Sequence, residues 1–318
     1  MTRILFFGTP HAAVRVLEAL VQWPMGTVVG VVTAPDRPRG RGQQVEPTPV
    51  KAWALRAQLP VFQPDTLKRP EVARALRVWS ADVFIVTAYG FILPPAVLQI
   101  PLHGCLNVHF SLLPKYRGAA PVARALLAGE RETGVTIIRM NERMDAGPIL
   151  AQRVVPIRDD DTTGTLEDRL ARAGAALLIE VLPDYLAGRI RPVEQDESAA
   201  TFAPKVQKEE GRIRWDRPAE WIERQVRAMD PWPSAYTWWR GRLLKITRAR
   251  VVPDMDDEAP GTTVYVDKKR WVVACGRDAL ELLEVQLESR PRMAVSAFLQ
   301  GHPVRLGERL EEAGPGSP

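Results

Sequence analysis

Short apolar runs alternate with amphipathic segments along the first half of the chain. Four of these runs are rich in β-branched and aromatic side chains and predict buried strands: residues 3–7, 28–33, 83–88 and 105–110. Helical spacing of apolar residues, as from Val14 to Val21, separates the first two runs. Buried strands alternating with helices are typical of a parallel sheet covered on both faces. We therefore predict an α/β fold with a doubly wound, Rossmann-like, mostly parallel sheet.

The pattern continues to about residue 189. Residues 135–140 and 149–157 predict a later pair of strands, joined by the turn-forming stretch "NERMDAGP". Apolar residues from Leu166 to Val181 then predict a long amphipathic helix that ends near Gly188. We assign residues 1–189 to a catalytic domain.

The pattern changes beyond residue 190. Residues 190–207 are polar and have little periodicity, which is typical of a linker. A helix at 218–229 and several short strands punctuated by glycine follow: 235–240, 243–252, 262–266, 271–275 and 279–287. Many short strands with turns predict a small β-barrel, which we place at residues 208–312, and we expect a disordered tail at 313–318.

Composition narrows the class of protein. The 318 residues contain two cysteines far apart, which favours a reducing compartment and offers no disulfide framework. The chain has no apolar run of membrane-spanning length and no signal-peptide pattern at its start, so we expect a soluble, cytoplasmic protein without a membrane partner. The net charge is +5, and residues 205–250 hold twelve Lys and Arg against six Asp and Glu. This excess indicates either a surface for a polyanion or an ordinary solvated surface.

A pair of polar residues interrupts the apolar run at 105–110. Asn107 and His109 are two positions apart, so in a strand they share one face. They lie at the carboxyl end of a predicted parallel strand, which is where open α/β sheets place their ligands. An amide can stabilise an oxygen that gains charge, and an imidazole can move protons near neutral pH. The alternative is that both are core polar groups bonded to the backbone; we favour the functional interpretation for the pair.

Asp145 is the candidate carboxylate that orients His109. It lies in the turn between the two later strands, from which it can reach back to the strand end. A turn-forming role is the alternative interpretation. No serine or cysteine nucleophile is paired with this group, which favours direct transfer between two bound substrates. The acidic stretch "RDDDTTGTLEDR" lacks the spacing of a calcium loop, and we predict no metal site.

The connection "APDRPRGRGQQVEPTPVK" (residues 34–51) is long for a link between a strand and a helix, and such loops are usually functional. Its basic residues suit phosphate groups or bases: Arg37, Arg39, Arg41 and Lys51. A disordered basic loop is the alternative.

Several motifs together resemble the formyltransferase family that uses 10-formyltetrahydrofolate. They are "NVH" at 107–109, "SLLPKYRGAAP" at 111–121 and "MDAGP" at 144–148. The start "ILFFGTP", the segment "TAPDRPRGRG" and the basic, strand-rich second half are similar to the branch of this family that acts on methionyl-tRNA. The resemblance extends over the whole chain.

The resemblance implies specific roles. It assigns catalysis to Asn107, His109 and Asp145, and the lining of the folate pocket to Ser111, Leu112, Leu113 and Pro114. It implies that the loop around Arg41 contacts the acceptor stem of initiator methionyl-tRNA, and that the second domain is OB-like and binds tRNA. Gln43 and Gln44 stand where lysines are common in the family, which removes charge from this loop. A monomer without a metal, with 10-formyltetrahydrofolate as co-substrate, is expected.

Three other functions remain as alternatives. A formyltransferase acting on a small amine, such as a nucleotide sugar or a purine precursor, would keep Asn107, His109 and Asp145 but would not need the basic loop. An inactive RNA-binding homologue would not need these three residues. A nicotinamide oxidoreductase is disfavoured because "FFGTP" lacks the Gly-x-Gly-x-x-Gly fingerprint.

Overall fold

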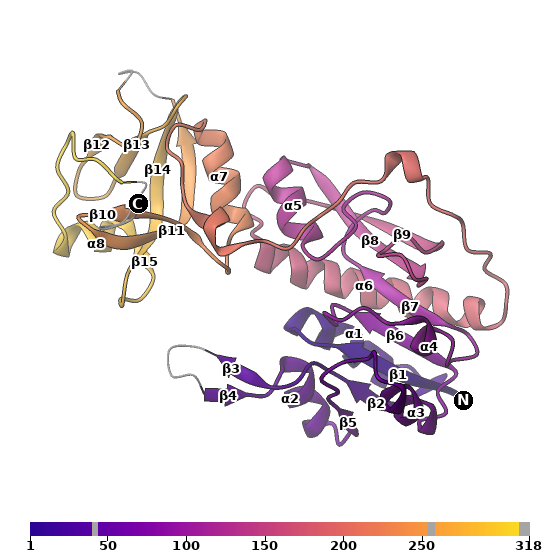
Figure 1. Cartoon of the computed structure of the whole chain (residues 1–318). Coiled ribbons are helices and arrows are strands. Elements are labelled where there is room, and N and C mark those ends of the chain that lie inside the picture. The colour runs from indigo at the N-terminus through magenta and orange to yellow at the C-terminus, as the bar shows by residue number, and fades with distance from the viewer. Residues whose placement is uncertain (40–43, 254–257, 312–318) are drawn as a thin grey trace. The chain divides into compact units, whose positions relative to one another are not determined.

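The computed structural model describes residues 1–39, 44–253 and 258–311, which form two compact units (Figure 1). The first unit contains residues 1–121, 131–157 and 166–205. The second contains 122–130, 158–165 and the described residues from 206 onward. Two short segments that precede residue 166 in the chain thus belong to the second unit. The limits predicted from the sequence, at 189 and 208, stay a prediction.

A seven-stranded sheet forms the centre of the first unit, in the order β5-β2-β1-β6-β7-β8-β9. Its strands are β1 (Thr2–Gly8), β2 (Gly26–Val32), β5 (Val61–Phe62), β6 (Val83–Thr87), β7 (Cys105–His109), β8 (Glu132–Arg139) and β9 (Ile149–Pro156). The first five strands in this order are parallel, and β8 and β9 add to β7 in antiparallel fashion. The predicted Rossmann-like, mostly parallel sheet is confirmed.

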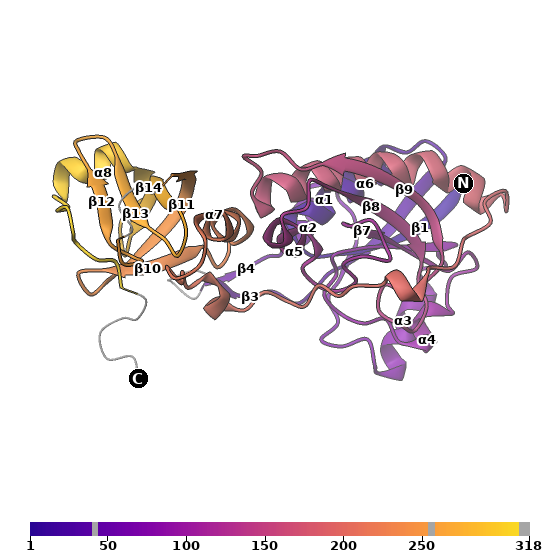
Figure 2. The same cartoon turned by 90° about the horizontal axis from the view of Figure 1, so that it is seen from above.

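Helices cover both faces of this sheet (Figure 2). The helices are α1 (His11–Gln22), α2 (Pro49–Arg56), α3 (Pro70–Val78), α4 (Pro95–Leu98) and α6 (Thr163–Leu186), whereas α5 (Pro121–Ala128) belongs to the second unit from Val122 onward. Helix α6 approaches β7 and β8 at Gly174, where an added Cβ would lie 2.6 Å from Val108. Helices α3 and α4 pack on the other face, in a cluster that includes Phe84 and Cys105.

The two polar residues of β7 lie on one face of the sheet, because side chains alternate between the two faces along a strand. Val108 faces α6, whereas Cys105 faces the cluster of α3 and α4. Because side chains alternate along a strand, Asn107 and His109 share the face of Cys105. The sheet pairs Asn107 with Val86 of parallel β6 and with Ile138 of antiparallel β8, so the strand is held on both sides up to the end that carries the polar pair.

The second unit contains one antiparallel sheet of six strands. These are β10 (Ala235–Trp239), β11 (Arg242–Val252), β12 (Thr263–Val266), β13 (Trp271–Ala274), β14 (Ala279–Leu287) and β15 (Met293–Ala294), with α7 (Ala219–Ala228) and α8 (Val295–Gly301) beside them. The path runs β10-β11-β14-β13-β12 and does not close among the described residues. The segment at 307–311 hydrogen-bonds to both edge strands, to Thr263 of β12 and to Trp238 of β10. It thereby covers two strand edges that would otherwise be open.

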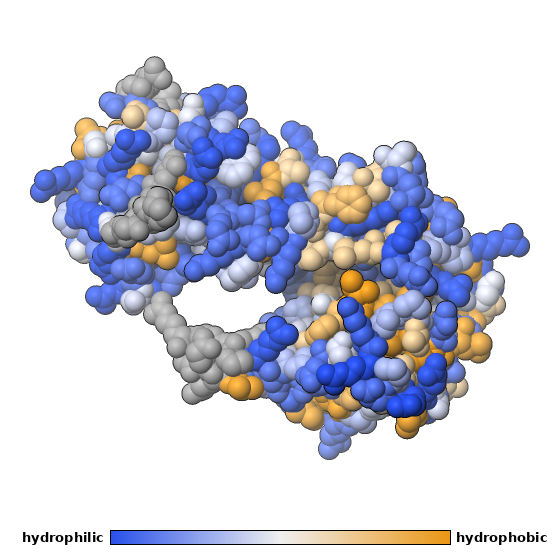
Figure 3. All heavy atoms as spheres, viewed as in Figure 1, coloured by the Kyte–Doolittle hydropathy of each residue, from blue (hydrophilic) through white to orange (hydrophobic). Residues whose placement is uncertain are grey.

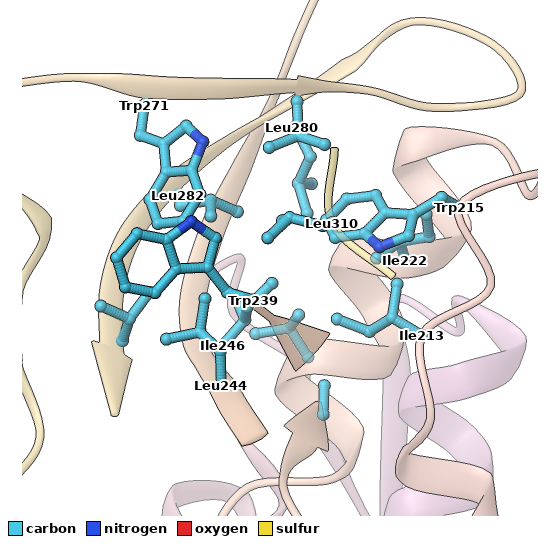
Figure 4. Close-up of a cluster of buried hydrophobic side chains, with 14 of the residues drawn as sticks. Ile213, Trp215, Ile222, Trp239, Leu244, Ile246, Trp271, Leu280, Leu282 and Leu310 are labelled. Carbon is cyan, nitrogen blue, oxygen red and sulfur yellow. The ribbon is translucent and has the colours of Figure 1, made fainter. Parts of the chain in front are cut away.

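Tryptophans form much of the core of this unit (Figure 4). Trp215 and Trp271 are fully buried, and their indole N–H groups donate to Thr237 and Thr263 over 3.2 and 3.1 Å. Indole rings buried with a satisfied N–H contribute large apolar area at no polar cost. These tryptophans therefore stabilise the unit, whereas Trp232 is exposed.

The visible surface of the second unit is mostly hydrophilic (Figure 3).

In the described parts of the chain, no helix is both long and apolar enough to cross a membrane. The same residues contain no cluster of histidine, cysteine or acidic side chains that could hold a metal ion. Cys105 and Cys275 are both buried and are not joined by a disulfide.

Candidate active site

Asn107 and His109 end β7 as buried polar residues, with only 8% and 6% of their surface exposed. A buried polar side chain is costly unless it has hydrogen-bond partners. The partners of both are found in two loops that reach the strand end, one after β7 and one between β8 and β9. The sequence predicted this pair, its shared face and its position at the carboxyl end of the sheet.

Asp145 lies between the two side chains. Its Oδ1 accepts from Asn107 Nδ2 over 3.3 Å, and its Oδ2 lies 3.7 Å from His109 Nδ1. Oδ2 also accepts from the backbone N–H of Gly118 over 2.8 Å. Asp145 itself has a left-handed backbone, with φ of 50°. The structure thus brings together Asn107, His109 and Asp145, the three residues that the sequence predicted. His109 and Asp145 are too far apart for a direct hydrogen bond.

The imidazole of His109 has its two nitrogens in different surroundings. Nε2 lies 3.0 Å from the backbone oxygen of Tyr116. Because a carbonyl oxygen can only accept, Nε2 carries the hydrogen of that bond. Nδ1 is then the atom that can take up or release a proton, and the carboxylate of Asp145 is the charged group beside it.

Gly118 is required where it stands. Its φ is 125°, a region that other residues rarely adopt, and an added Cβ would lie 2.7 Å from the backbone oxygen of Ala203. This close approach lets its N–H reach the carboxylate of Asp145. The glycine of the "YRG" stretch therefore serves the site through its backbone.

The segment from Ser111 to Pro114 is fixed by hydrogen bonds to the antiparallel strands. Thr136 of β8 donates from Oγ1 to the backbone oxygen of Ser111 over 2.6 Å and accepts from the N–H of Leu113 over 3.1 Å. Gln152 of β9 donates to the backbone oxygen of Leu113 over 2.7 Å. Ser111 and Leu113 are buried, whereas Leu112 and Pro114 are partly exposed. The predicted folate residues thus divide into two supporting side chains and two that remain accessible.

Two buried hydroxyls at the end of neighbouring β6 were missed by the sequence analysis. Thr87 Oγ1 and the hydroxyl of Tyr89 have no hydrogen-bond partner among the described residues. Burial raises the pKa of the Tyr89 phenol, so it remains a protonated donor. The backbone oxygen of Tyr89 accepts from Thr9 Oγ1 over 2.9 Å, which joins the ends of β1 and β6. No motif or periodicity distinguishes these hydroxyls in the sequence.

Arg117 and Gln195 were also missed. Arg117 is 3% exposed and Gln195 8%. The guanidinium of Arg117 donates from Nε and Nη2 to Gln195 Oε1 over 3.1 and 2.8 Å. Gln195 lies in the polar stretch predicted as a linker. Its partners are distant in the sequence, so they are recognised only in the folded chain.

The basic connection at 34–51 contains a two-stranded hairpin, β3 (Arg37–Arg39) paired with β4 (Gln44–Glu46), followed by α2. The sequence predicted a long loop over these residues, and part of that loop forms this hairpin. Arg37 is exposed on β3, and Arg39 takes part through its backbone. Arg41 lies outside the described residues.

Lys51 lies in the first turn of α2. Its backbone N–H donates to Oγ1 of the capping residue Thr48 over 3.1 Å. Its ammonium group is bonded to the carboxylate of Asp36. Burial by itself would raise the pKa of Asp36, but hydrogen bonds from Lys51 and Gln63 hold it below its usual value. The charge of Lys51 is thus balanced within the chain by Asp36, and its predicted contact with tRNA stays a prediction.

Residues 2–182 match the family model described as "Formyl transferase", and residues 205–303 match that of "Formyl transferase, C-terminal domain". The chain belongs to the formyl transferase family.

Curated relatives are similar over almost the full length. A methionyl-tRNA formyltransferase of Chloroflexus aggregans is 52% identical over 300 residues, covering 94% of this chain and 97% of the relative. One of Methylococcus capsulatus is 48% identical over 308 residues, covering 97% and 99%. Members of this formyl transferase branch therefore share both units of the chain and their order.

Solved structures show the same fold at low identity. A methionyl-tRNA formyltransferase from Clostridium thermocellum superposes with a TM-score of 0.56 at 15% identity, over 79% of this chain and 94% of that one. HypX from Aquifex aeolicus in complex with tetrahydrofolic acid gives a TM-score of 0.62 at 18% identity. That comparison covers 93% of this chain but only 46% of HypX.

Proposed function

We propose that this chain transfers the formyl group of 10-formyltetrahydrofolate to the α-amino group of methionyl-tRNA, for translation initiation. The observation that carries the proposal is the likeness to curated methionyl-tRNA formyltransferases, 52% and 48% identical across both units. The convergence of Asn107, His109 and Asp145 at one strand end supplies the chemistry.

The reaction makes three demands on the site. The methionyl nitrogen attacks the formyl carbon, a new C–N bond forms, and the carbonyl oxygen becomes an oxyanion. The bond from carbon to the folate nitrogen then breaks, the attacking amine loses a proton, and the folate nitrogen gains one. The site must therefore stabilise the oxyanion, accept one proton and donate another.

Asn107 is assigned to the oxyanion. Its Nδ2 carries two hydrogens, one of which is directed to Asp145 Oδ1, and the second is left to donate to a substrate. The bond to Asp145 fixes the amide, so the donor need not reorganise when charge develops. Donors of this kind are worth about a hundred- to a thousand-fold in rate.

His109 is assigned to proton movement. Nε2 is held by the backbone of Tyr116, which leaves Nδ1 to take the amine's proton and to return a proton to the folate nitrogen. Asp145 lies beside Nδ1 and balances the positive charge that the ring carries between these steps. General acid–base help of this kind contributes about a hundred- to ten-thousand-fold.

We place the folate beside the carboxyl end of β7, next to Asn107 and His109. Leu112 and Pro114 are the accessible members of the segment braced by β8 and β9. The buried Tyr89 hydroxyl, which has no hydrogen-bond partner among the described residues, offers a donor to a polar ring. Both features are consistent with a folate pocket at this edge of the sheet.

The tRNA is assigned to the basic hairpin and the second unit. Arg37, Arg39 and Arg41 are the arginines of the hairpin connection, and Lys51 follows it. We assign residues 208–312 as a tRNA-binding domain, supported by the excess of basic residues at 205–250. We also propose that the protein acts as a monomer in the cytoplasm, where charged tRNA is used.

A comparison of acceptors tests the function. Purified protein is supplied with 10-formyltetrahydrofolate and with initiator methionyl-tRNA, elongator methionyl-tRNA or a nucleotide-linked amino sugar. We expect kcat/KM to be highest for initiator methionyl-tRNA. Faster formylation of the amino sugar would replace the proposal with the small-amine alternative, and no formylation of any acceptor would favour an inactive homologue.

A further inference from the structure

We propose that Arg117 and Gln195 are positioning residues for formyl transfer, which act by holding the loop that carries Asp145. This inference rests on the proposed function, since it assumes that Asp145 takes part in the reaction. Neither residue has an acceptor or donor role of its own in the mechanism above. Their contacts lead to the catalytic carboxylate by way of its backbone.

Gln195 is bonded on both sides of its amide. Its Nε2 donates to the backbone oxygens of Asp145 and Gly147 over 2.8 and 2.7 Å. Its Oε1 accepts two N–H groups from Arg117. Because all its hydrogen bonds are directed at these three residues, the amide fixes the turn that places Asp145.

The orientation of this amide depends on Arg117. A glutamine amide can be turned end for end, which would set its oxygen against two carbonyl oxygens. The guanidinium of Arg117 has only donors, so the amide oxygen must face it and the amide nitrogen must face the loop. The second edge of the guanidinium is bound by Glu197, at 3.0 Å from Nη1 to Oε2 and 3.0 Å from Nη2 to Oε1. These hydrogen bonds lower the pKa of Glu197 and keep it charged.

The position of Arg117 is set in turn by its own backbone. Its N–H donates to Thr201 over 2.8 Å, and its oxygen accepts from Ala203 over 2.7 Å. Thr201 and Ala203 belong to a segment that begins at Val193. Val193 exchanges two backbone hydrogen bonds with Ile149 at the start of β9. Residues 193–203 therefore connect the loop of Asp145 to the loop after β7, which carries the Tyr116 oxygen that holds His109.

Two independent anchors thus act on Asp145. Gly118 and Asn107 hold its carboxylate, while Gln195 holds its backbone, where φ is 50°. Such a backbone persists only where its surroundings enforce it. Without Gln195, the carboxylate keeps its partners but the turn behind it is released. Displacements of about 1 Å at such a site can lower the rate by about a hundredfold.

The test uses the full-length protein, with formylation of methionyl-tRNA measured at saturating and at limiting 10-formyltetrahydrofolate. Gln195→Ala removes all four hydrogen bonds. Gln195→Glu keeps the acceptor for Arg117 but loses the donor to the loop. We expect both variants to lower kcat, by ten- to a hundredfold in order of magnitude, with little change in KM for the folate. Arg117→Met should lower kcat similarly, and Arg117→Lys should recover part of the loss.

Gln225→Ala is the matched control. Gln225 is also buried, and its Nε2 also donates to two backbone oxygens, those of Glu210 and Arg212, but in the second unit. It should lose thermal stability comparably to Gln195→Ala and retain kcat at saturating methionyl-tRNA, because this amide is buried in the core of its unit and is not part of the surface assigned to tRNA. Equal losses of kcat in the two variants would overturn the positioning role, because they would reflect general loosening.

A double variant separates this inference from the function on which it rests. If Gln195 acts through Asp145, Gln195→Ala should cause little further loss in Asp145→Asn. Multiplied losses would overturn the inference. Wild-type kcat in Gln195→Ala, beside a strongly impaired Asp145→Asn, would overturn the positioning role alone. Absence of formylation by the unaltered protein would instead overturn the proposed function.

Discussion

The carboxylate of Asp145 faces the imidazole of His109, with 3.7 Å between Oδ2 and Nδ1. The other ring nitrogen is bonded to a backbone oxygen, which fixes the edge of the ring that faces the carboxylate. This arrangement needs no nucleophilic side chain, and it suits a reaction in which an amine and a formyl donor meet directly.

Asn107→Ala should lower kcat by about a hundred- to a thousand-fold and leave the KM for 10-formyltetrahydrofolate nearly unchanged. The lost amide is the donor assigned to the oxyanion, which exists only as the bond to carbon forms. Steady-state kinetics with varied folate provide the measurement, with the exposed Gln22→Ala as control. Near-normal turnover by a folded Asn107→Ala protein would remove Asn107 from the mechanism.

The basic hairpin should contribute to tRNA affinity. Arg37→Ala and Arg41→Ala should each raise the apparent KM for methionyl-tRNA more than the KM for the folate, because an arginine pairs with phosphate. Arg74→Ala, which removes an exposed arginine from α3, is the matched control and should change neither value. Equal increases in both KM values for the hairpin variants would contradict a specific role in tRNA binding.

Lys51 should prove to support the fold as well. The pKa of Asp36 is held below its ordinary value of 3.8, so the stability gained from the pair is present above that pH and is lost as the pH falls below it. Lys51→Met should therefore cost about 1 kcal/mol of unfolding free energy at pH 7, and less in acid. Denaturant unfolding at several pH values measures this cost. A cost that is independent of pH would show that the ion pair is not its cause.

Glu167 on α6 should show the opposite sign. Burial raises its pKa above the ordinary value of 4.5, so the folded protein binds this proton more tightly than the unfolded chain does. Stability from this group is therefore full in acid and is lost as the pH rises through the folded pKa. Glu167→Gln should raise the Tm at pH 7 and lose that advantage below pH of about 4. A lower Tm for the variant at pH 7 would show that the carboxylate has a stabilising partner.

The elements that the sequence predicted best are those with a simple period. Strands β1, β2 and β6 show nearly unbroken apolar runs, and in β7 alternation alone placed Asn107 and His109 on one face. The later pair β8 and β9 was predicted for the same reason. Such patterns show which faces of an element are buried, and they can be recognised within a short stretch of sequence.

The parts that were missed depend on contacts between distant segments. The amide of Gln195 reaches a loop 50 residues away in the chain, from a polar segment without periodicity. Of the six residues in β3 and β4, only Val45 is of the β-branched or aromatic type that favours strands, and Pro38 disfavours them. Residues 122–130 belong to the second unit although they follow the catalytic motif directly. No local pattern encodes any of these three relationships.

A single-turnover experiment tests the central claim most directly. Enzyme in excess is mixed with methionyl-tRNA and 10-formyltetrahydrofolate, and formylmethionyl-tRNA is followed over time for the unaltered protein and for Asp145→Asn. We predict complete formylation by the unaltered protein and a rate at least about a hundredfold lower for the variant, with folate binding retained. Formylation by Asp145→Asn at the unaltered rate would contradict the account.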